Sequence, residues 1–185
     1  LYYLLGLPGE NELEVEEIAV SARRIQTELG MGAGKKYYPG IIELTLSPLV
    51  PKPWTAFQWL KMEDKQVLEK KIKRIKAQLS PKQGFVIKSD SLREAVFQGI
   101  LARGDRSLSQ WLEKLALNQI SLTQLLKNQE LVKQYLRERE PEEIFPWDIV
   151  DPGVKKEYLW RELNKAISGK TTPECRKNCK ECGAC

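Results

Sequence analysis

The sequence predicts an α/β protein, with a small parallel sheet and its helices in the first half and helices alone in the second. Over residues 1–90, strand-like segments alternate with amphipathic segments of helical length, a pattern typical of βαβ units with parallel strands. From residue 91 onward, the apolar residues recur only at helical spacing. The chain of 185 residues is 42% hydrophobic and 30% charged, which is the composition of a globular protein that can bury a core.

The first strand and helix each have a local signal. Tyr2–Leu5 is strand-like, and Gly6–Gly9 is expected to form the loop that follows. Asn11 can cap a helix, and Glu14 three residues later completes a capping box. We expect this helix to end near Gly30. Its buried face is predicted to consist of Val15, Ile18, Ala22, Ile25 and Leu29.

Two more strands and a second helix follow. Residues 40–47 are expected to form a strand, which the Pro-rich segment 48–53 ends. A helix over about residues 64–79 precedes a short strand over residues 84–88. The apolar stripe of that helix is Leu68, Ile72, Ile75 and Leu79. An open sheet of three parallel strands leaves both edges bare, and the chain starts inside a strand at Leu1, so we expect it to be the C-terminal part of a larger protein.

The second half is predicted to contain three segments after residue 90. These are a helical extension over residues 91–140, a linker with a C-terminal helix over residues 141–170, and a cysteine-rich tail over residues 171–185. Apolar residues at helical spacing lie on both sides of Gly104. Further helices are expected near residues 121–127, 129–137 and 152–168.

Composition excludes some classes of protein and site. The longest apolar runs, such as Tyr2–Leu5, fall far short of the roughly 20 residues that span a bilayer. No signal-peptide pattern opens the sequence. We therefore expect a cytoplasmic protein with no membrane partner. The chain has no histidine, which removes the commonest general base and the commonest metal ligand.

A basic run covers residues 61–82, which include eight Lys and Arg residues and only three Asp and Glu residues. Such a run could bind the phosphates of RNA or DNA. A basic run of this kind is more often the solvated side of an amphipathic helix, and we favour that interpretation.

All four cysteines lie in the last eleven residues, with the spacing Cys-x3-Cys-x2-Cys-x2-Cys. The predicted metal ligands are Cys175, Cys179, Cys182 and Cys185. Zinc and iron–sulfur clusters each take four sulfur ligands, and the sequence does not choose between them. Two disulfides are the alternative, which a reducing cytosol opposes; a further alternative is that one or two of the cysteines have no role.

Several motifs resemble one enzyme family. Tyr2–Glu10 (YYLLGLPGE), followed by an acidic helix, resembles the fifth-strand region of radical S-adenosylmethionine barrels, in the branch related to methylthiotransferases and coproporphyrinogen dehydrogenases. Ser47–Trp59 resembles the sixth-strand exit of an uncharacterised bacterial subfamily, whose members often carry a cobalamin-binding-type domain before the barrel. Leu101–Arg106, Pro146–Asp148 and the final Cys-Gly-Ala-Cys fit the same subfamily.

The resemblance implies a fold and two sets of site residues. Residues 1–90 would be the second half of a partial TIM-type radical S-adenosylmethionine barrel. The residues implied to border S-adenosylmethionine are Leu5, Gly6, Leu7, Pro8 and Gly9. The implied substrate rim, beyond the next strand, consists of Ser47, Lys52, Thr55, Gln58 and Trp59. Cys175, Cys179 and Cys182 share the spacing of the family's catalytic cysteines, but Glu181 stands where an aromatic residue is usual, so the tail is interpreted as an auxiliary or structural site.

The resemblance also implies cofactors and partners. The whole enzyme would cleave S-adenosylmethionine at a 4Fe-4S cluster whose ligands lie upstream, so this part is not expected to be active alone. It would need an electron donor such as flavodoxin or ferredoxin, and an unidentified substrate, either RNA or a small molecule. Cobalamin is implied where the upstream domain is present. The alternative hypothesis is a module that binds RNA or a protein and holds a structural zinc.

Overall fold

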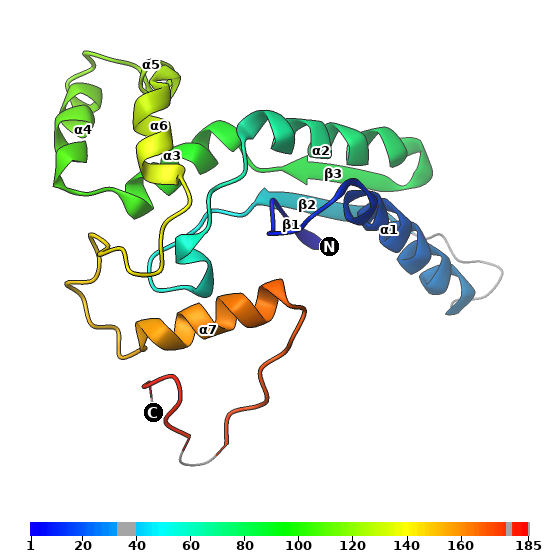
Figure 1. The fold of residues 1–185 in the computed structure, drawn as a ribbon. Helices are drawn as coiled ribbons and strands as arrows, with labels where there is room; N and C mark the ends of the chain where they lie inside the picture. Colours follow the sequence, from blue (N-terminus) through cyan, green and yellow to red (C-terminus); the bar gives the residue numbers. More distant parts are fainter. Residues whose placement is uncertain (33–39, 177–178, 185) are drawn as a thin grey trace. The chain divides into compact units, whose positions relative to one another are not determined.

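The computed structural model describes residues 1–32, 40–176 and 179–184. Within these residues it shows an α/β fold with three parallel strands and seven α-helices (Figure 1). The strands are β1 (Tyr2–Leu5), β2 (Ile42–Pro48) and β3 (Phe85–Ser89). The helices are α1 (Glu12–Gly32), α2 (Lys65–Gln78), α3 (Leu92–Arg103), α4 (Ser109–Ala116), α5 (Leu122–Lys127), α6 (Gln129–Leu136) and α7 (Lys156–Ile167). No helix of this described part is long and apolar enough to cross a membrane.

The chain folds as two compact units, which interleave along the sequence. Unit 1 consists of Leu1–Leu49 and Glu63–Ala95, and unit 2 consists of Val50–Met62 and Val96–Cys185. The sequence division at residue 90 therefore differs from the structure over residues 50–62, which fold with the C-terminal helices. Backbone hydrogen bonds hold them there: the N–H of Met62 donates to the Leu136 carbonyl at 3.0 Å, and the N–H of Arg139 donates to the Trp59 carbonyl at 2.8 Å.

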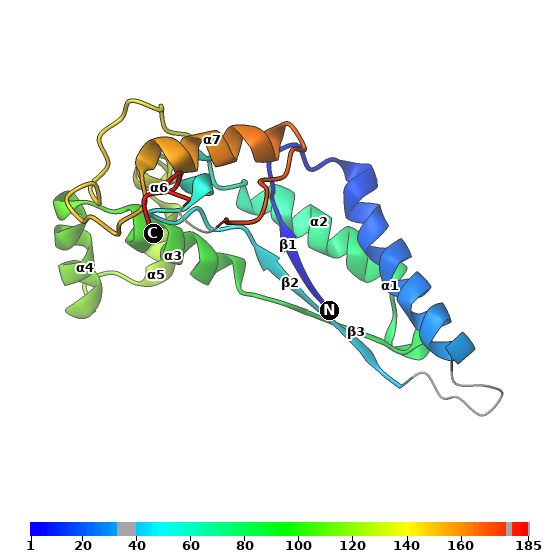
Figure 2. The same ribbon diagram turned by 90° about the horizontal axis from the view of Figure 1, so that it is seen from below.

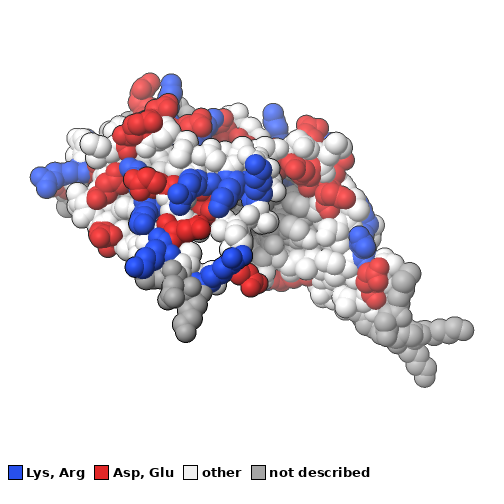
Figure 3. Space-filling model, turned by 60° about the horizontal axis from the view of Figure 1, so that its bottom comes forward, with Lys and Arg blue, Asp and Glu red and all other residues white. Residues whose placement is uncertain are grey.

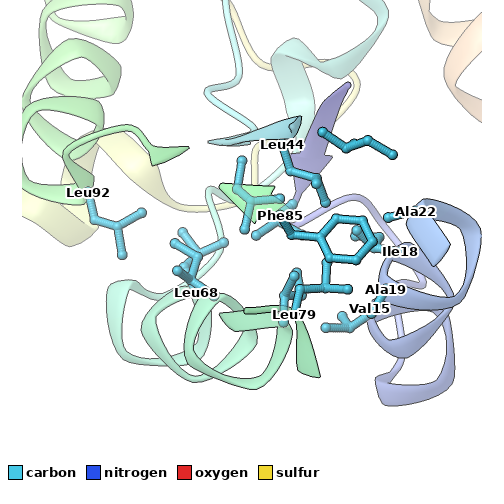
Figure 4. Close-up of a cluster of buried hydrophobic side chains, with 14 residues drawn as sticks. Val15, Ile18, Ala19, Ala22, Leu44, Leu68, Leu79, Phe85 and Leu92 are labelled. Carbon is cyan, nitrogen blue, oxygen red and sulfur yellow. The ribbon is translucent and has the colours of Figure 1, made fainter. Parts of the chain in front are cut away.

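In unit 1 the strands lie in the order β1-β2-β3, and both pairs are parallel. Side chains alternate along β2, where Ile42, Leu44 and Leu46 are buried and Glu43 is exposed. The buried face packs against α1 and α2, and Figure 4 shows their side chains meeting those of the strands. The predicted stripe of α2 is confirmed, since Leu68, Ile72, Ile75 and Leu79 are all buried in this core.

The start of α1 confirms the predicted capping box. The N–H of Asn11 donates to Glu14 Oε2 at 2.8 Å, and Asn11 Oδ1 accepts from the N–H of Glu14 at 3.2 Å. The helix runs to Gly32, beyond the predicted stop at Gly30, and Leu29 is 49% exposed, so its predicted place in the buried stripe is wrong. Arg23 already donates to the carbonyl of Gln78, the last residue of α2. The later turns of α1 therefore lie beyond the end of the helix they would pack against.

Part of the core of unit 2 is an aromatic cluster. Trp59 lies edge-on to Phe145, at 5.9 Å between ring centroids, and edge-on to Trp160, at 5.1 Å. The cluster joins the 3-10 segment Ala56–Trp59 to α7. After α7 the chain turns back, and its C-terminal end returns to the start of that helix, where the N–H of Lys155 donates to the Cys182 carbonyl (Figure 2). The helix starts at Lys156 rather than near Pro152, because the backbone between them forms a turn with Gly153 at φ +81°.

Candidate functional site

The turn at the carboxyl end of β1 is the best-defined of the predicted site segments. Gly6 and Gly9 adopt φ values of +86° and +81°, a region that residues with a Cβ atom rarely occupy. A Cβ atom on Gly6 would lie 2.9 Å from Cβ of Glu63, so the close approach of this neighbour also requires glycine. The N–H of Glu10 closes the turn by donating to the Leu7 carbonyl at 3.1 Å.

Glu10 and Lys71 hold this turn in place. Glu10 Oε2 accepts a hydrogen bond from the N–H of Gly6 at 2.9 Å. It also forms an ion pair with Lys71 Nζ, at 2.5 Å. Lys71 also reaches Glu63 at 3.4 Å. The side chains of Glu10 and Lys71 are only 8% and 13% exposed, so water screens their attraction little. Neither Glu10 nor Lys71 was predicted as a site residue, although Glu10 ends the YYLLGLPGE motif.

The structure separates the predicted S-adenosylmethionine contacts into two groups. Leu5 is fully buried in the core of unit 1, so its side chain is not available to a ligand. Gly6 is partly buried, whereas Leu7, Pro8 and Gly9 are exposed at the end of the strand. The exposed part of the turn is therefore the Leu7–Gly9 segment.

The sheet face opposite the helices is exposed and carries both polar and apolar side chains. Tyr2 is 87% exposed and Leu4 is 49% exposed. Lys88 and Glu43 form an ion pair on neighbouring strands, with 2.6 Å between Nζ and Oε2. Polar and apolar side chains thus share a surface that is open to a ligand or to another part of a larger protein.

Ser47 and Asp90 form a polar pair at the carboxyl end of this sheet. Ser47, a predicted rim residue, is the register partner of Leu4, and its Oγ donates to Asp90 Oδ2 at 2.6 Å. The N–H of Asp90 donates to the Leu46 carbonyl at 3.1 Å, which fixes the backbone beside β2. Asp90 was not predicted as a site residue. Its position directly after a predicted strand is the signal that could have identified it.

The other rim residues belong to unit 2, and only two of them are on the surface. Lys52 and Thr55 are exposed, and Thr55 Oγ1 donates to the Lys52 carbonyl at 2.8 Å. Gln58 and Trp59 are 1% and 2% exposed, so neither presents its side chain to a substrate. Gln58 Oε1 instead accepts from the indole N–H of Trp147 at 2.9 Å.

An open groove of about 670 Å³ lies between the start of α1 and α2 in unit 1. Four cations of the predicted basic run line it, Lys70, Lys71, Lys73 and Arg74, and carboxylates pair with Lys71 and Arg74. Lys71 pairs with Glu10 and Glu63, and Arg74 pairs with Glu12 at 2.7 Å and with Glu16 at 2.5 Å. Figure 3 shows a face of the molecule on which basic and acidic side chains intermingle. Lys71 and Arg74 are thus held by carboxylates, while Lys70 and Lys73 are exposed on the solvated side of the helix.

The predicted metal ligands lie in the C-terminal segment of unit 2. Cys175 is exposed, Cys179 and Cys182 are half-buried, and Cys185 lies outside the described residues. In the part of the chain that the structure describes, no three Cys, Asp or Glu side chains gather closely enough to hold a metal ion. The residue types suit a thiolate site, while the described cysteines are not brought together.

The chain is similar to an uncharacterized protein of Methanocaldococcus jannaschii. The two are 30% identical over 136 residues, which make up 74% of this chain and 28% of that protein. The chain thus spans little more than a quarter of the length of this relative. No family model matches the chain. No solved structure matches it either.

Proposed function

We propose that this chain is the C-terminal part of a radical S-adenosylmethionine enzyme and supplies the later strands of its partial TIM-type barrel. The observation that carries the proposal is the Gly6–Gly9 turn, which resembles the family's motif and lies at the carboxyl end of a parallel strand. Barrel enzymes bind their ligands at this end of the strands, because the loops there converge on the site.

The residues of the turn have the properties that a binding loop needs. Leu7 is 36% exposed and offers apolar contact to an adenine ring. Glu10 uses the Gly6 N–H and Lys71 to fix the backbone, so little conformational freedom would be lost on binding. S-adenosylmethionine, bound at a 4Fe-4S cluster held by upstream residues, would supply the radical chemistry.

The exposed sheet face would then contact the substrate. The Asp90 carboxylate accepts from Ser47 at one oxygen and has further lone pairs for a hydroxyl or amino group. Lys88 and Glu43 add one charge of each sign on the sheet. These groups can orient a polar substrate while Leu4 gives apolar contact.

Anaerobic reconstitution of the full-length protein tests the proposal. With iron, sulfide, a reductant and S-adenosylmethionine, we expect 5′-deoxyadenosine to form, measured by liquid chromatography. Failure to form it in a preparation with a complete iron–sulfur cluster would contradict the proposed function.

A matched pair of variants tests the role of the turn. Leu7→Ala should weaken S-adenosylmethionine binding about three- to tenfold, as expected for roughly 1 kcal/mol of lost apolar contact. Leu13→Ala is the control, since Leu13 lies on α1 and is 76% exposed. Equal affinity for both variants, measured by calorimetry, would remove the turn from the binding site.

A further inference from the structure

The α2 side of the groove between α1 and α2 is basic and partly apolar. All the cations that line the groove belong to α2. Lys71 and Arg74 pair with carboxylates, whereas Lys70 and Lys73 are exposed and form no ion pair within the described residues. Val67 lines the same groove and is 36% exposed. This surface therefore has two cations and an apolar side chain that are open to a partner.

The outward face of α1 has the complementary character. Leu13 and Val20 are 76% and 47% exposed, and they lie seven residues apart, so they share one face of the helix. Glu17 lies between them on that face and is exposed, with no ion pair in the described part of the chain. The first seven residues of α1 include four glutamates and no lysine or arginine. The start of α1 is thus an acidic helix with exposed apolar side chains.

The groove suits such a helix better than it suits a nucleic acid. Glu10 and Glu12 line it from the side of α1, where they would repel a phosphate backbone. A helix with separate carboxylates can instead place a carboxylate beside a lysine of α2 and an apolar side chain beside Val67. The chain itself contains a helix of this kind, since α1 has both features.

A two-fold axis can bring these two surfaces together twice. The start of α1 and the middle of α2 lie at the same level, because Lys71 pairs with Glu10 and Arg74 pairs with Glu12. Figure 4 shows the two helices side by side under the sheet. A two-fold axis exchanges identical surfaces, so a copy that places its α1 on the α2 of a second copy receives the second α1 on its own α2.

We propose that two copies of the chain associate through this groove, with the Leu13–Val20 face of α1 in each copy packed on the Val67–Lys73 face of α2 in the other. Lys73 and Glu17 supply opposite charges across the interface. The two helices are roughly 30 and 20 Å long, so the interface is small, and we expect a weak dimer that salt weakens further. The interface includes no residue of the Leu7–Gly9 segment and is independent of the proposed function.

The mass of the full-length protein in solution tests the proposal. Sedimentation equilibrium in about 50 mM salt should show monomers and dimers in equilibrium, and about 0.5 M salt should shift the equilibrium toward monomers, because the Debye length falls. A wild type that stays monomeric at about 100 μM protein in the lower salt would overturn the proposal, even if RNA binds to the groove.

Reversed charges test whether this groove holds the second copy. Lys73→Glu places acidic surfaces against each other and Glu17→Lys places basic ones, so each variant alone should dimerise about tenfold more weakly. An equal mixture of the two variants should restore wild-type association, because every lysine then faces a glutamate again.

Lys82→Glu is the matched control for these variants, since Lys82 is exposed and lies outside the groove. It should dimerise like the wild type. Lys73→Glu and Glu17→Lys variants that dimerise as strongly as Lys82→Glu would overturn the interface, and so would a mixture that associates no better than its components. None of these measurements involves S-adenosylmethionine, so the interface and the proposed function can fail separately.

Discussion

Glu143 lies between two arginines of unit 2 and links the stability of that unit to pH. Arg137 donates two hydrogen bonds to its carboxylate, at 2.9 and 2.7 Å, and Arg139 donates one at 3.0 Å. Partial burial raises the pKa of Glu143, but the hydrogen bonds and positive charges of these arginines outweigh it. The pKa therefore lies below its ordinary value of 4.5. Arg139 is itself 7% exposed and lies over the rings of Phe145 and Trp147, so it needs this counter-charge.

We expect Glu143→Gln to lower the free energy of unfolding of unit 2 by about 1–2 kcal/mol at neutral pH, as typical for lost hydrogen bonds between charged groups that are partly exposed. The folded state binds the proton less tightly than the unfolded chain. The stabilisation is therefore present above pH 4.5 and is lost as the pH falls through the lower pKa of the folded state. Urea denaturation at several pH values should show the difference between wild type and variant shrinking in acid.

The neighbouring Glu142 provides the control for this experiment. Glu142 is exposed, so Glu142→Gln should follow the wild type at each pH. If Glu143→Gln has a free energy of unfolding that is lower than that of the wild type by the same amount throughout the acid range, the carboxylate does not act through its charge.

At the scale of single residues, the sequence identified chemical types better than burial. Gly6 and Gly9 indicated a loop, and both residues have positive φ. Gln58 and Trp59 are of types that bind substrates, yet they lie inside unit 2. Their burial depends on residues such as Trp147, whose indole donates to Gln58 from 89 positions away. No local pattern contains that contact.

At the scale of elements, carboxylates form ion pairs with some of the cations of α2 and not with all of its basic surface. Lys71 lies on the side of α2 that faces Glu10 and Glu63, whereas Lys70 is exposed. We expect Lys71→Met to destabilise unit 1 by about 2–4 kcal/mol, because it leaves two partly buried carboxylates without a cation. Far-UV circular dichroism during urea denaturation measures this loss.

Lys70→Met removes the same charge from an exposed position of α2 and should change stability by less than about 0.5 kcal/mol. Equal stability of the Lys71→Met and Lys70→Met variants would mean that the pairing with Glu10 adds nothing to the fold. If RNA binds to the chain and both variants weaken RNA binding equally, the basic run acts as a charged surface despite the ion pairs of Lys71.

Element boundaries were predictable where a local signal sets them. The strand Tyr2–Leu5 has the bounds that its sequence indicated, and the Asn11 capping box starts α1. The start of α7 was not predictable in this way. The turn before it is joined to the tail by the hydrogen bond from Lys155 to Cys182, and a contact over 27 positions has no signal within the helix.

At the scale of the whole molecule, each unit has a hydrophobic cluster of its own. The cluster of unit 1 consists mainly of side chains from the strands, α1 and α2, and the aromatic cluster of unit 2 includes none of them. The sequence predicted the α/β class, because helices and strands alternate at the right lengths. It did not predict that residues 50–62 join unit 2, because that membership rests on backbone contacts with residues 136 and 139.

Separate cores predict separate unfolding, and the distribution of tryptophan allows a test. All five tryptophans lie in unit 2, so their fluorescence reports that unit, whereas circular dichroism reports the helices of both. Ile75 and Leu163 are buried in the cores of units 1 and 2, and truncating either to alanine should cost about 2–4 kcal/mol. Ile75→Ala should lower the midpoint of the dichroism transition in urea and leave the fluorescence midpoint nearly unchanged, while Leu163→Ala should lower the fluorescence midpoint. If each variant shifts both midpoints equally, the two cores unfold as one cooperative block, because a loss in one then removes stability from the other.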